Sequence, residues 1–117
     1  SSVVFTASIS GYNNVAPANG IYGTSKSALS TYMKYAALEL AGKGIRCNAV
    51  QPGRINTPLI SNRLLSEEDV TKDIEQYPMK RYGKPEEVAH AIIYLLSDAS
   101  AWVTGTNLVI DGGRSLK

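Results

Sequence analysis

The order of three segments near the N-terminus constrains the fold more than any other feature of the sequence. Residues 3–6 and 45–50 are short stretches rich in β-branched and other apolar side chains, which is typical of buried strands. Between them, residues 21–40 carry apolar side chains at helical spacing, and glycines at positions 42 and 44 mark the end of that helix. Because only a few residues join the helix to the second run, we expect two parallel strands joined by a right-handed crossover helix.

The rest of the chain repeats this alternation after a longer insertion. Residues 54–83 are polar and irregular, with weak helical periodicity only around 67–75. Proline at position 85, followed by two glutamates, indicates the start of a second helix, and residues 106–110 form a third apolar run. The pattern predicts a single α/β domain over residues 1–117, with the βαβαβ order of the C-terminal half of a doubly wound parallel sheet.

The insertion at residues 54–83 is long for a connection inside a compact domain, and such connections usually cover or shape a binding site. It also follows the carboxyl end of a strand, where ligands bind in sheets of this type. We therefore interpret it as a substrate lid, with Leu59, Ile60 and Leu64 as side chains that shape the pocket.

Charge and composition argue against several classes of partner. The net charge is only +2, and the basic residues are scattered without forming a long run, so we expect neither a nucleic acid nor a membrane surface as partner. No apolar stretch is long enough to span a bilayer. The single cysteine, Cys47, lies in an apolar run, which favours a packing role and a reducing, cytoplasmic location. His90 has no second histidine or cysteine nearby, so we assign no metal site.

Tyr22 and Lys26 are four residues apart at the start of the long helix, so their side chains face the same way. A free phenol has a pKa near ~10, too high for a base at neutral pH, and a nearby ammonium stabilises the phenolate. The hydroxyl of Ser8 follows the neighbouring strand and can donate a hydrogen bond to a carbonyl or alcohol oxygen at the same place. The three side chains would together surround one reacting oxygen.

Four longer segments place these residues in context. They are SISG at 8–11, YGTSK at 22–26, GIRCNAVQPGRINTP at 44–58 and GKPEEVAHAIIYLLSDASAWVTGTNLVIDGG at 83–113. Together they resemble the short-chain dehydrogenase/reductase family over essentially the whole chain. The resemblance implies the C-terminal part of an NAD(P)-binding Rossmann domain. The parent protein would be an oxidoreductase that transfers a hydride between NAD or NADP and a carbonyl or secondary-alcohol substrate.

The resemblance also implies roles for individual residues. Tyr22 would be the general acid/base, Lys26 would tune it and bind the cofactor ribose, and Ser8 would polarise the reacting oxygen. The nicotinamide end of the cofactor would lie against the segment PGRINT, through Pro52, Gly53, Ile55 and Thr57. The long helix commonly packs against its twin in this family, and a three-stranded sheet leaves an edge unpaired, so we expect a homo-oligomer, either a dimer or a tetramer.

The sequence departs from the family pattern in the spacing of its serine. The family usually has one residue fewer between serine and tyrosine than lies between Ser8 and Tyr22. Gly11 keeps the family's spacing from serine to glycine, which favours Ser8 and leaves Ser10 as the lesser candidate.

A second departure concerns the cofactor pyrophosphate. The G-x-G-x-x-G turn that holds it in the family's first half does not occur in these residues, and the chain opens inside a strand without methionine, so we expect a piece of a longer protein. By itself the chain would then do no chemistry and would act as a structural or self-association module. Sugar-nucleotide epimerases and dehydratases also use this tyrosine and lysine spacing, but PGRINT and the ending VIDGG argue against them.

Overall fold

The computed structural model describes residues 1–57 and 66–117, and its elements follow the expected order. Leu59, Ile60 and Leu64, the expected pocket-shaping residues, lie outside the described part. The elements are strand β1 (Ser2–Thr6), helix α1 (Gly20–Leu40), strand β2 (Arg46–Pro52), helices α3 (Glu67–Glu75) and α4 (Pro85–Leu96), and strand β3 (Asn107–Ile110). Short 3-10 turns follow α1, α4 and β3, as η1 (Ala41–Lys43), η2 (Asp98–Ser100) and η3 (Arg114–Leu116).

The three strands form one parallel sheet in the order β1–β2–β3. Thr6 of β1 lies opposite Val50 of β2, and Pro52 of β2 lies opposite Ile110 of β3. Residues 47–51 of the central strand are all buried, as expected for a strand that is covered on both faces. The prediction of an α/β fold with a parallel sheet is confirmed.

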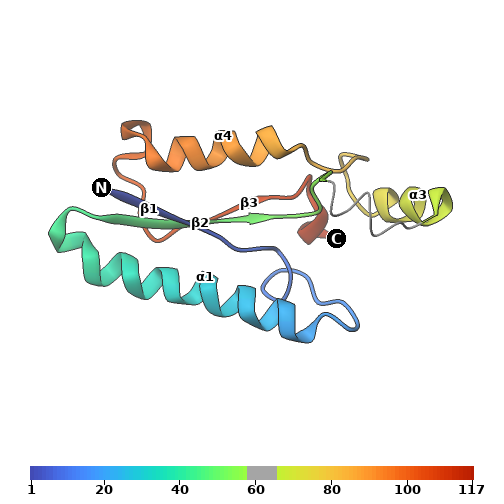
Figure 1. The fold of residues 1–117 in the computed structure, drawn as a ribbon, viewed down its shortest axis with the longest axis horizontal. Coiled ribbons are helices and arrows are strands. Elements are labelled where there is room, and N and C mark those ends of the chain that lie inside the picture. Colours follow the sequence, from blue (N-terminus) through green and yellow to red (C-terminus); the bar gives the residue numbers. More distant parts are fainter. Residues whose placement is uncertain (58–65) are drawn as a thin grey trace.

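Helices α1 and α4 lie on opposite faces of the sheet (Figure 1). Each connection moves the chain one strand further in the same direction, so helices on opposite faces give the two crossovers opposite hands. Only one crossover can therefore have the right-handed sense that nearly all such connections adopt. The connections also differ in path, because the second one first runs out through α3, beyond the carboxyl end of the sheet, and returns along α4 (Figure 1).

The core between α1 and the sheet consists mainly of short side chains. Met33, Ala36 and Ala37 of α1 pack with Cys47 and Ala49 of β2, and each of the five is at most 6% exposed. The free cysteine is therefore a core residue, as its place in the expected buried strand indicated. Side chains two apart on a strand point to the same face, so the next residue on this face of β2 is position 51, a glutamine.

Strand β2 continues two residues beyond the expected end at Val50. The carbonyl of Pro52 accepts a hydrogen bond from the N–H of Ile9 at 3.1 Å, and the N–H of Gly53 donates to the carbonyl of Ile110 at 2.9 Å. Proline has no N–H, but it is tolerated at a strand end because its carbonyl can still pair. The extension brings the loop after β1 and the end of β3 to the same turn.

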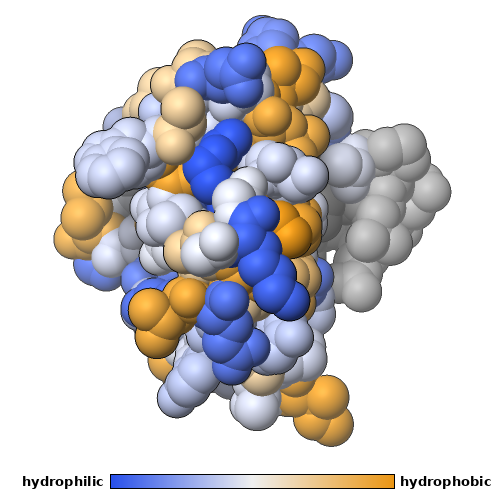
Figure 2. Space-filling model, turned by 90° about the vertical axis from the view of Figure 1, so that its left-hand side faces the viewer, coloured by the Kyte–Doolittle hydropathy of each residue, from blue (hydrophilic) through white to orange (hydrophobic). Residues whose placement is uncertain are grey.

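The end of the molecule where the strands begin shows hydrophobic and polar side chains interspersed over its surface (Figure 2). Among residues 1–57 and 66–117, no helix is both long and apolar enough to cross a bilayer. The side chains with candidate chemistry gather at the other end, where the strands finish.

Candidate active site at the carboxyl end of the sheet

Tyr22 and Lys26 lie together on the first turns of α1. The Lys26 ammonium nitrogen lies 5.8 Å from the centroid of the Tyr22 ring and donates a hydrogen bond to the carbonyl of Thr6 at 3.1 Å. Thr6 is the last residue of β1, and Ser8 follows two residues later. Because Tyr22 is 48% exposed, its phenol remains open to a ligand. The ammonium thus joins the tyrosine to the strand end that carries the serine.

Ser8 is held as an extension of the sheet. The N–H groups on either side of it, from Ala7 and Ile9, donate to the carbonyls of Val50 and Pro52. Ser8 itself is 8% exposed, and its hydroxyl oxygen accepts a hydrogen bond from the N–H of Ser10 at 3.0 Å. Its backbone position is therefore fixed by β2.

The lesser candidate, Ser10, has a different environment. Its hydroxyl oxygen accepts a hydrogen bond from the amide of Asn19 at 3.4 Å, and its backbone pairs with Asn14 inside the loop. Ser10 therefore belongs to the loop that leads to α1, whereas Ser8 belongs to the strand end.

Gly11 brings this loop into direct contact with α1. Its φ of +81° lies in the left-handed region that favours glycine. A Cβ atom at this position would overlap the carbonyl of Gly23 and would lie 2.6 Å from the hydroxyl oxygen of Ser27. The loop after Ser8 is thus fixed against the helix turn that follows Tyr22. This contact explains why a glycine stands three residues after the serine.

The predicted cofactor-binding residues line up along the chain that leaves β2. Pro52 ends the strand and Gly53 begins the turn, where an added Cβ would lie 2.9 Å from the Cβ of Asp111. Ile55 forms an isolated bridge with Gly83. Thr57, the last of the four predicted contacts, is half-buried.

The turn after Pro52 is backed by phenolic and charged side chains. The N–H of Arg54 donates to the phenol oxygen of Tyr77 at 3.1 Å. The Arg54 guanidinium and the Tyr82 hydroxyl both donate to one carboxylate oxygen of Asp73, each at 2.6 Å. Burial raises the pKa of Tyr82, and its bond to Asp73 raises it further. Burial also raises the pKa of Tyr77, so both phenols stay neutral at physiological pH.

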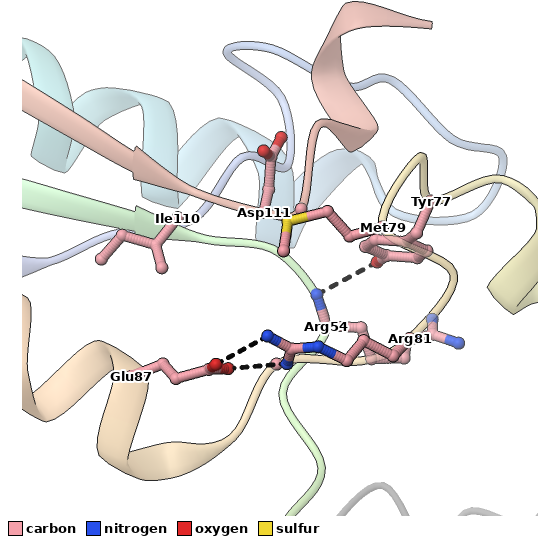
Figure 3. Close-up of a pocket in the computed structure, with 9 residues that line it drawn as sticks. Arg54, Tyr77, Met79, Arg81, Glu87, Ile110 and Asp111 are labelled. Atoms are coloured by element: carbon pink, nitrogen blue, oxygen red, sulfur yellow. Dashed lines mark hydrogen bonds and ion pairs between the residues drawn. The ribbon is translucent and has the colours of Figure 1, made fainter.

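A cavity of about 220 Å³ lies beside this turn, between the end of β3, the start of α4 and residues 77–83 (Figure 3). Arg81 and Glu87 form a two-point ion pair on one wall, at 2.7 and 2.9 Å. The labelled lining residues are Arg54, Tyr77, Met79, Arg81, Glu87, Ile110 and Asp111. Ser8, Tyr22 and Lys26 are not among the residues that line it, so the catalytic candidates face a different space.

No metal site is found among the described residues, in which no three His, Cys, Asp or Glu side chains lie close enough to hold an ion. His90 is exposed on α4.

Comparison with known proteins shows which family has this arrangement. Residues 1–115 match a family model described as enoyl-(acyl carrier protein) reductase. The chain is 42% identical over 115 residues to a cyclohexanol dehydrogenase from an Acinetobacter species. It is 43% identical over 113 residues to a 3-oxoacyl-[acyl-carrier-protein] reductase from Thermotoga maritima. A solved short-chain type dehydrogenase/reductase from Mycobacterium ulcerans superposes on 99% of the chain with a TM-score of 0.93 and 37% identity.

The chain belongs to the short-chain dehydrogenase/reductase family. It spans less than half of each relative: 43% of the Acinetobacter protein, 44% of the Thermotoga protein and 42% of the Mycobacterium chain. Its matches cover 98%, 96% and 99% of the chain itself. The three-stranded sheet is therefore part of the Rossmann fold of the short-chain dehydrogenase/reductases, as predicted.

Several residues of this short-chain dehydrogenase/reductase site were not anticipated from the sequence. Gln51 connects Asn13 in the loop after Ser8 to Ser30 on α1. A glutamine directly after a predicted buried strand and directly before a Pro-Gly turn was a signal that could have identified it. Tyr77 and Asp73 had no such signal, because their contacts depend on the path of the long second connection.

Proposed function

We propose that the protein containing this chain is an NAD- or NADP-dependent oxidoreductase that transfers a hydride between the nicotinamide and a carbonyl or secondary-alcohol substrate. The observation that carries the proposal is the position of the Lys26 ammonium. It lies between the Tyr22 ring and the end of β1, two residues before Ser8. A phenol and an ammonium beside the strand end that leads to a serine hydroxyl suit the protonation of a forming alkoxide.

In the reduction direction, each of the three side chains has a separate task. Ser8 donates a hydrogen bond to the substrate carbonyl oxygen and orients it. Tyr22 gives its hydroxyl proton to that oxygen as the C–H bond forms. Lys26 stabilises the phenolate that remains on Tyr22. The bound nicotinamide supplies the hydride in this direction and accepts it in the reverse direction.

The residues present fit the nicotinamide and ribose end of such a cofactor. Tyr22 is half-exposed and Lys26 half-buried, so both can be reached from the strand end. Pro52, Gly53, Ile55 and Thr57 follow the adjacent strand end and would contact the nicotinamide. The sequence has no G-x-G-x-x-G turn for the pyrophosphate, so we also propose that residues 1–117 alone neither bind the cofactor tightly nor catalyse the reaction.

The substrate is proposed as a small molecule that carries a carbonyl or secondary hydroxyl group. Two relatives are named for cyclohexanol and for 3-oxoacyl chains, which carry groups of this kind. The segment 54–83 remains our candidate for a substrate lid. Its described parts are joined at their base, where the N–H groups of Asn56 and Gly83 donate to the carbonyls of Gly83 and Arg54.

Self-association as a homo-oligomer, a dimer or a tetramer, is part of the proposal. Large side chains on α1 remain exposed, including Tyr35 at 63% and Leu38 at 81%. Such exposure along a helix is typical of a surface that contacts another element. We also propose a cytoplasmic location, on the basis of the free, buried Cys47.

Tyr22→Phe in the full-length protein tests the proposed function. We expect kcat to fall by at least about 100-fold, because the general acid/base is removed. The assay follows NADH and NADPH oxidation with a panel of ketones. Tyr94→Phe is the matched control, because it removes an exposed phenol oxygen from α4, a helix that carries none of the catalytic candidates. Retention of most of the turnover by Tyr22→Phe would rule out the mechanism. NADH binding at low micromolar affinity by a chain of only these 117 residues would contradict the proposed inactivity.

A further inference from the structure

The side chain of Gln51 is a buried amide whose oxygen and nitrogen both form hydrogen bonds. Gln51 is 0% exposed. Its carbonyl oxygen accepts a hydrogen bond from the side-chain amide of Asn13 at 2.6 Å, and its nitrogen donates to the hydroxyl oxygen of Ser30 at 3.0 Å. Ser30 is also 0% exposed. Burying a polar group without a hydrogen bond costs free energy, so these two hydrogen bonds fix the orientation of the amide.

The two partners of Gln51 belong to the two segments that carry the catalytic candidates. Asn13 lies in the loop after Ser8, and its N–H donates to the carbonyl of Ile9 at 2.9 Å. Ser30 lies on α1, one turn beyond Lys26 and two turns beyond Tyr22, at positions that share one face.

Gln51 itself comes directly before the Pro52–Gly53 turn. We infer that Gln51 is a positioning residue that holds the loop of Ser8 at a fixed distance from the helix face of Tyr22 and Lys26. This inference rests on the proposed function. It adds a residue that touches neither substrate nor cofactor and acts through Asn13. Positional errors of about 1 Å in a catalytic group can cost on the order of 100-fold in rate, so such a residue has a measurable effect on kcat.

Asn48 provides a matched control on the same strand. It is also 0% exposed and also uses both ends of its amide. Its nitrogen donates to the carbonyl of Val103 and its oxygen accepts from the N–H of Thr106, each at 3.0 Å. These partners belong to the chain that enters β3, away from the candidate catalytic residues. Loss of Asn48 therefore removes two partly buried hydrogen bonds without disturbing the loop of Ser8.

The test compares Gln51→Met, Asn13→Ala and Asn48→Leu in the full-length protein. We expect Gln51→Met and Asn13→Ala to lower kcat by about 10- to 100-fold per folded molecule. The dissociation constant for NADH or NADPH, titrated without substrate, should change by less than about twofold, since Gly53 keeps its bond to Ile110. The double variant Asn13→Ala/Gln51→Met should have a kcat no lower than that of Gln51→Met, because both substitutions remove the same hydrogen bond between Asn13 and Gln51. Asn48→Leu should keep its kcat per folded molecule.

Hydrogen exchange supplies a readout that does not depend on activity. The N–H groups of Gly11, Asn13 and Asn14 are bonded within the loop. They should exchange faster in Gln51→Met than in Asn48→Leu. If Gln51→Met does not fold, Asn13→Ala carries the test, since Asn13 is only half-buried.

Two results would overturn the inference. One is a kcat within twofold of wild type in both Asn13→Ala and Gln51→Met. The other is an equal loss of kcat in Asn48→Leu. If Tyr22→Phe is inactive in the same preparation, either result removes only the positioning role. If Tyr22→Phe is active, the proposed function fails, and the exchange experiment still decides whether Gln51 holds the loop.

Discussion

The two segments that flank the Pro52–Gly53 turn are held in place by different kinds of interaction. The loop over residues 8–19 is held mainly by neutral groups, namely backbone bonds to β2, a glycine contact with α1 and a buried amide. Its contact with the charged Lys34 ammonium, through the Tyr12 hydroxyl at 3.3 Å, is exposed. The described parts of residues 54–83 add a network of charged and phenolic groups to the backbone bonds at their base. The side chains of Arg54 and Asp73, at the centre of that network, are 38% and 23% exposed.

This difference determines which segment responds to solution conditions. Buried neutral hydrogen bonds do not titrate and are little affected by salt, whereas partly exposed ion pairs weaken as ionic strength rises. We therefore expect the loop over residues 8–19 to stay fixed at salt concentrations that loosen the described parts of residues 54–83. A fixed serine and a segment that loosens more easily are consistent with the lid interpretation, which remains a prediction.

The largest effect is expected from a substitution in the loop over residues 8–19. Gly11→Ala places a methyl group against the carbonyl of Gly23 at a φ of +81°. We expect a loss of at least about 2 kcal/mol in the free energy of unfolding, because both steric overlap and backbone strain are introduced. Urea denaturation measures it.

Gly20→Ala is the control for this change, since an added Cβ there meets nothing within 4 Å and lies at the start of α1. It should stabilise the protein by about 0.5 kcal/mol. Equal changes in the free energy of unfolding from the two substitutions would show that the contact between Gly11 and α1 does not hold the loop over residues 8–19 in place.

A smaller effect is expected from a substitution in the charged network around Asp73. Asp73→Asn removes the charge that Arg54 and Tyr82 share. We expect a loss of about 1–2 kcal/mol at low salt, since a partly buried guanidinium loses its counter-charge, and a smaller loss at high salt. Hydrogen exchange should rise in the described parts of residues 54–83 and stay unchanged in 8–19.

Glu68→Gln supplies the comparison for Asp73. Glu68 pairs with Lys72 at 3.3 Å on the surface of α3, with side chains 77% and 72% exposed. Its loss should change the free energy of unfolding by less than about 0.5 kcal/mol. Faster hydrogen exchange in residues 8–19 of Asp73→Asn would show that the two segments are not held independently of each other.

The smallest effect depends on pH. Hydrogen bonds from the Arg81 guanidinium, and then from the N–H of Lys84, lower the pKa of Glu87 from its ordinary 4.5 to about 2. A carboxyl with a lowered pKa in the folded state stabilises the protein above its unfolded pKa, and this contribution is lost as pH falls through the folded value. Glu87→Gln should thus lower the urea midpoint at pH 6, and its difference from wild type should shrink between about pH 4.5 and 2.

Glu86→Gln, on the same first turn of α4, is the control for Glu87. Its urea midpoint should follow wild type over the same pH range. A difference between Glu87→Gln and wild type that stays constant from pH 6 to pH 2 would exclude the ion pair as its cause.

The sequence predicted those parts of the fold that depend on local periodicity. Helix α1 could be recognised from apolar spacing and its glycine end, and parallel pairing followed from the short connection to β2. The catalytic candidates came from the family motifs, and the structure brings Lys26 close to Tyr22 and to the end of β1. Their roles remain a prediction.

The features that could not be predicted involve residues distant in sequence. The end of β2 at Pro52 depends on bonds from Ile9 and to the end of β3, which no local pattern encodes. Asp73 meets Arg54 across 19 residues of chain, a contact set by the path of the second connection. The opposite hands of the two crossovers go against a statistical rule, so the sequence alone favoured the commoner arrangement.

The bridge between Ile55 and Gly83 gives the second connection a narrow base. Two residues that are 28 positions apart in the chain lie side by side, so the segment that begins after Ile55 ends beside the point where it began. A segment whose two ends meet can change in length without moving β2, provided that Met79 keeps its bond to Gly112 and Arg81 its pair with Glu87. One scaffold of strands and helices could in this way be fitted with different substrate-facing inserts.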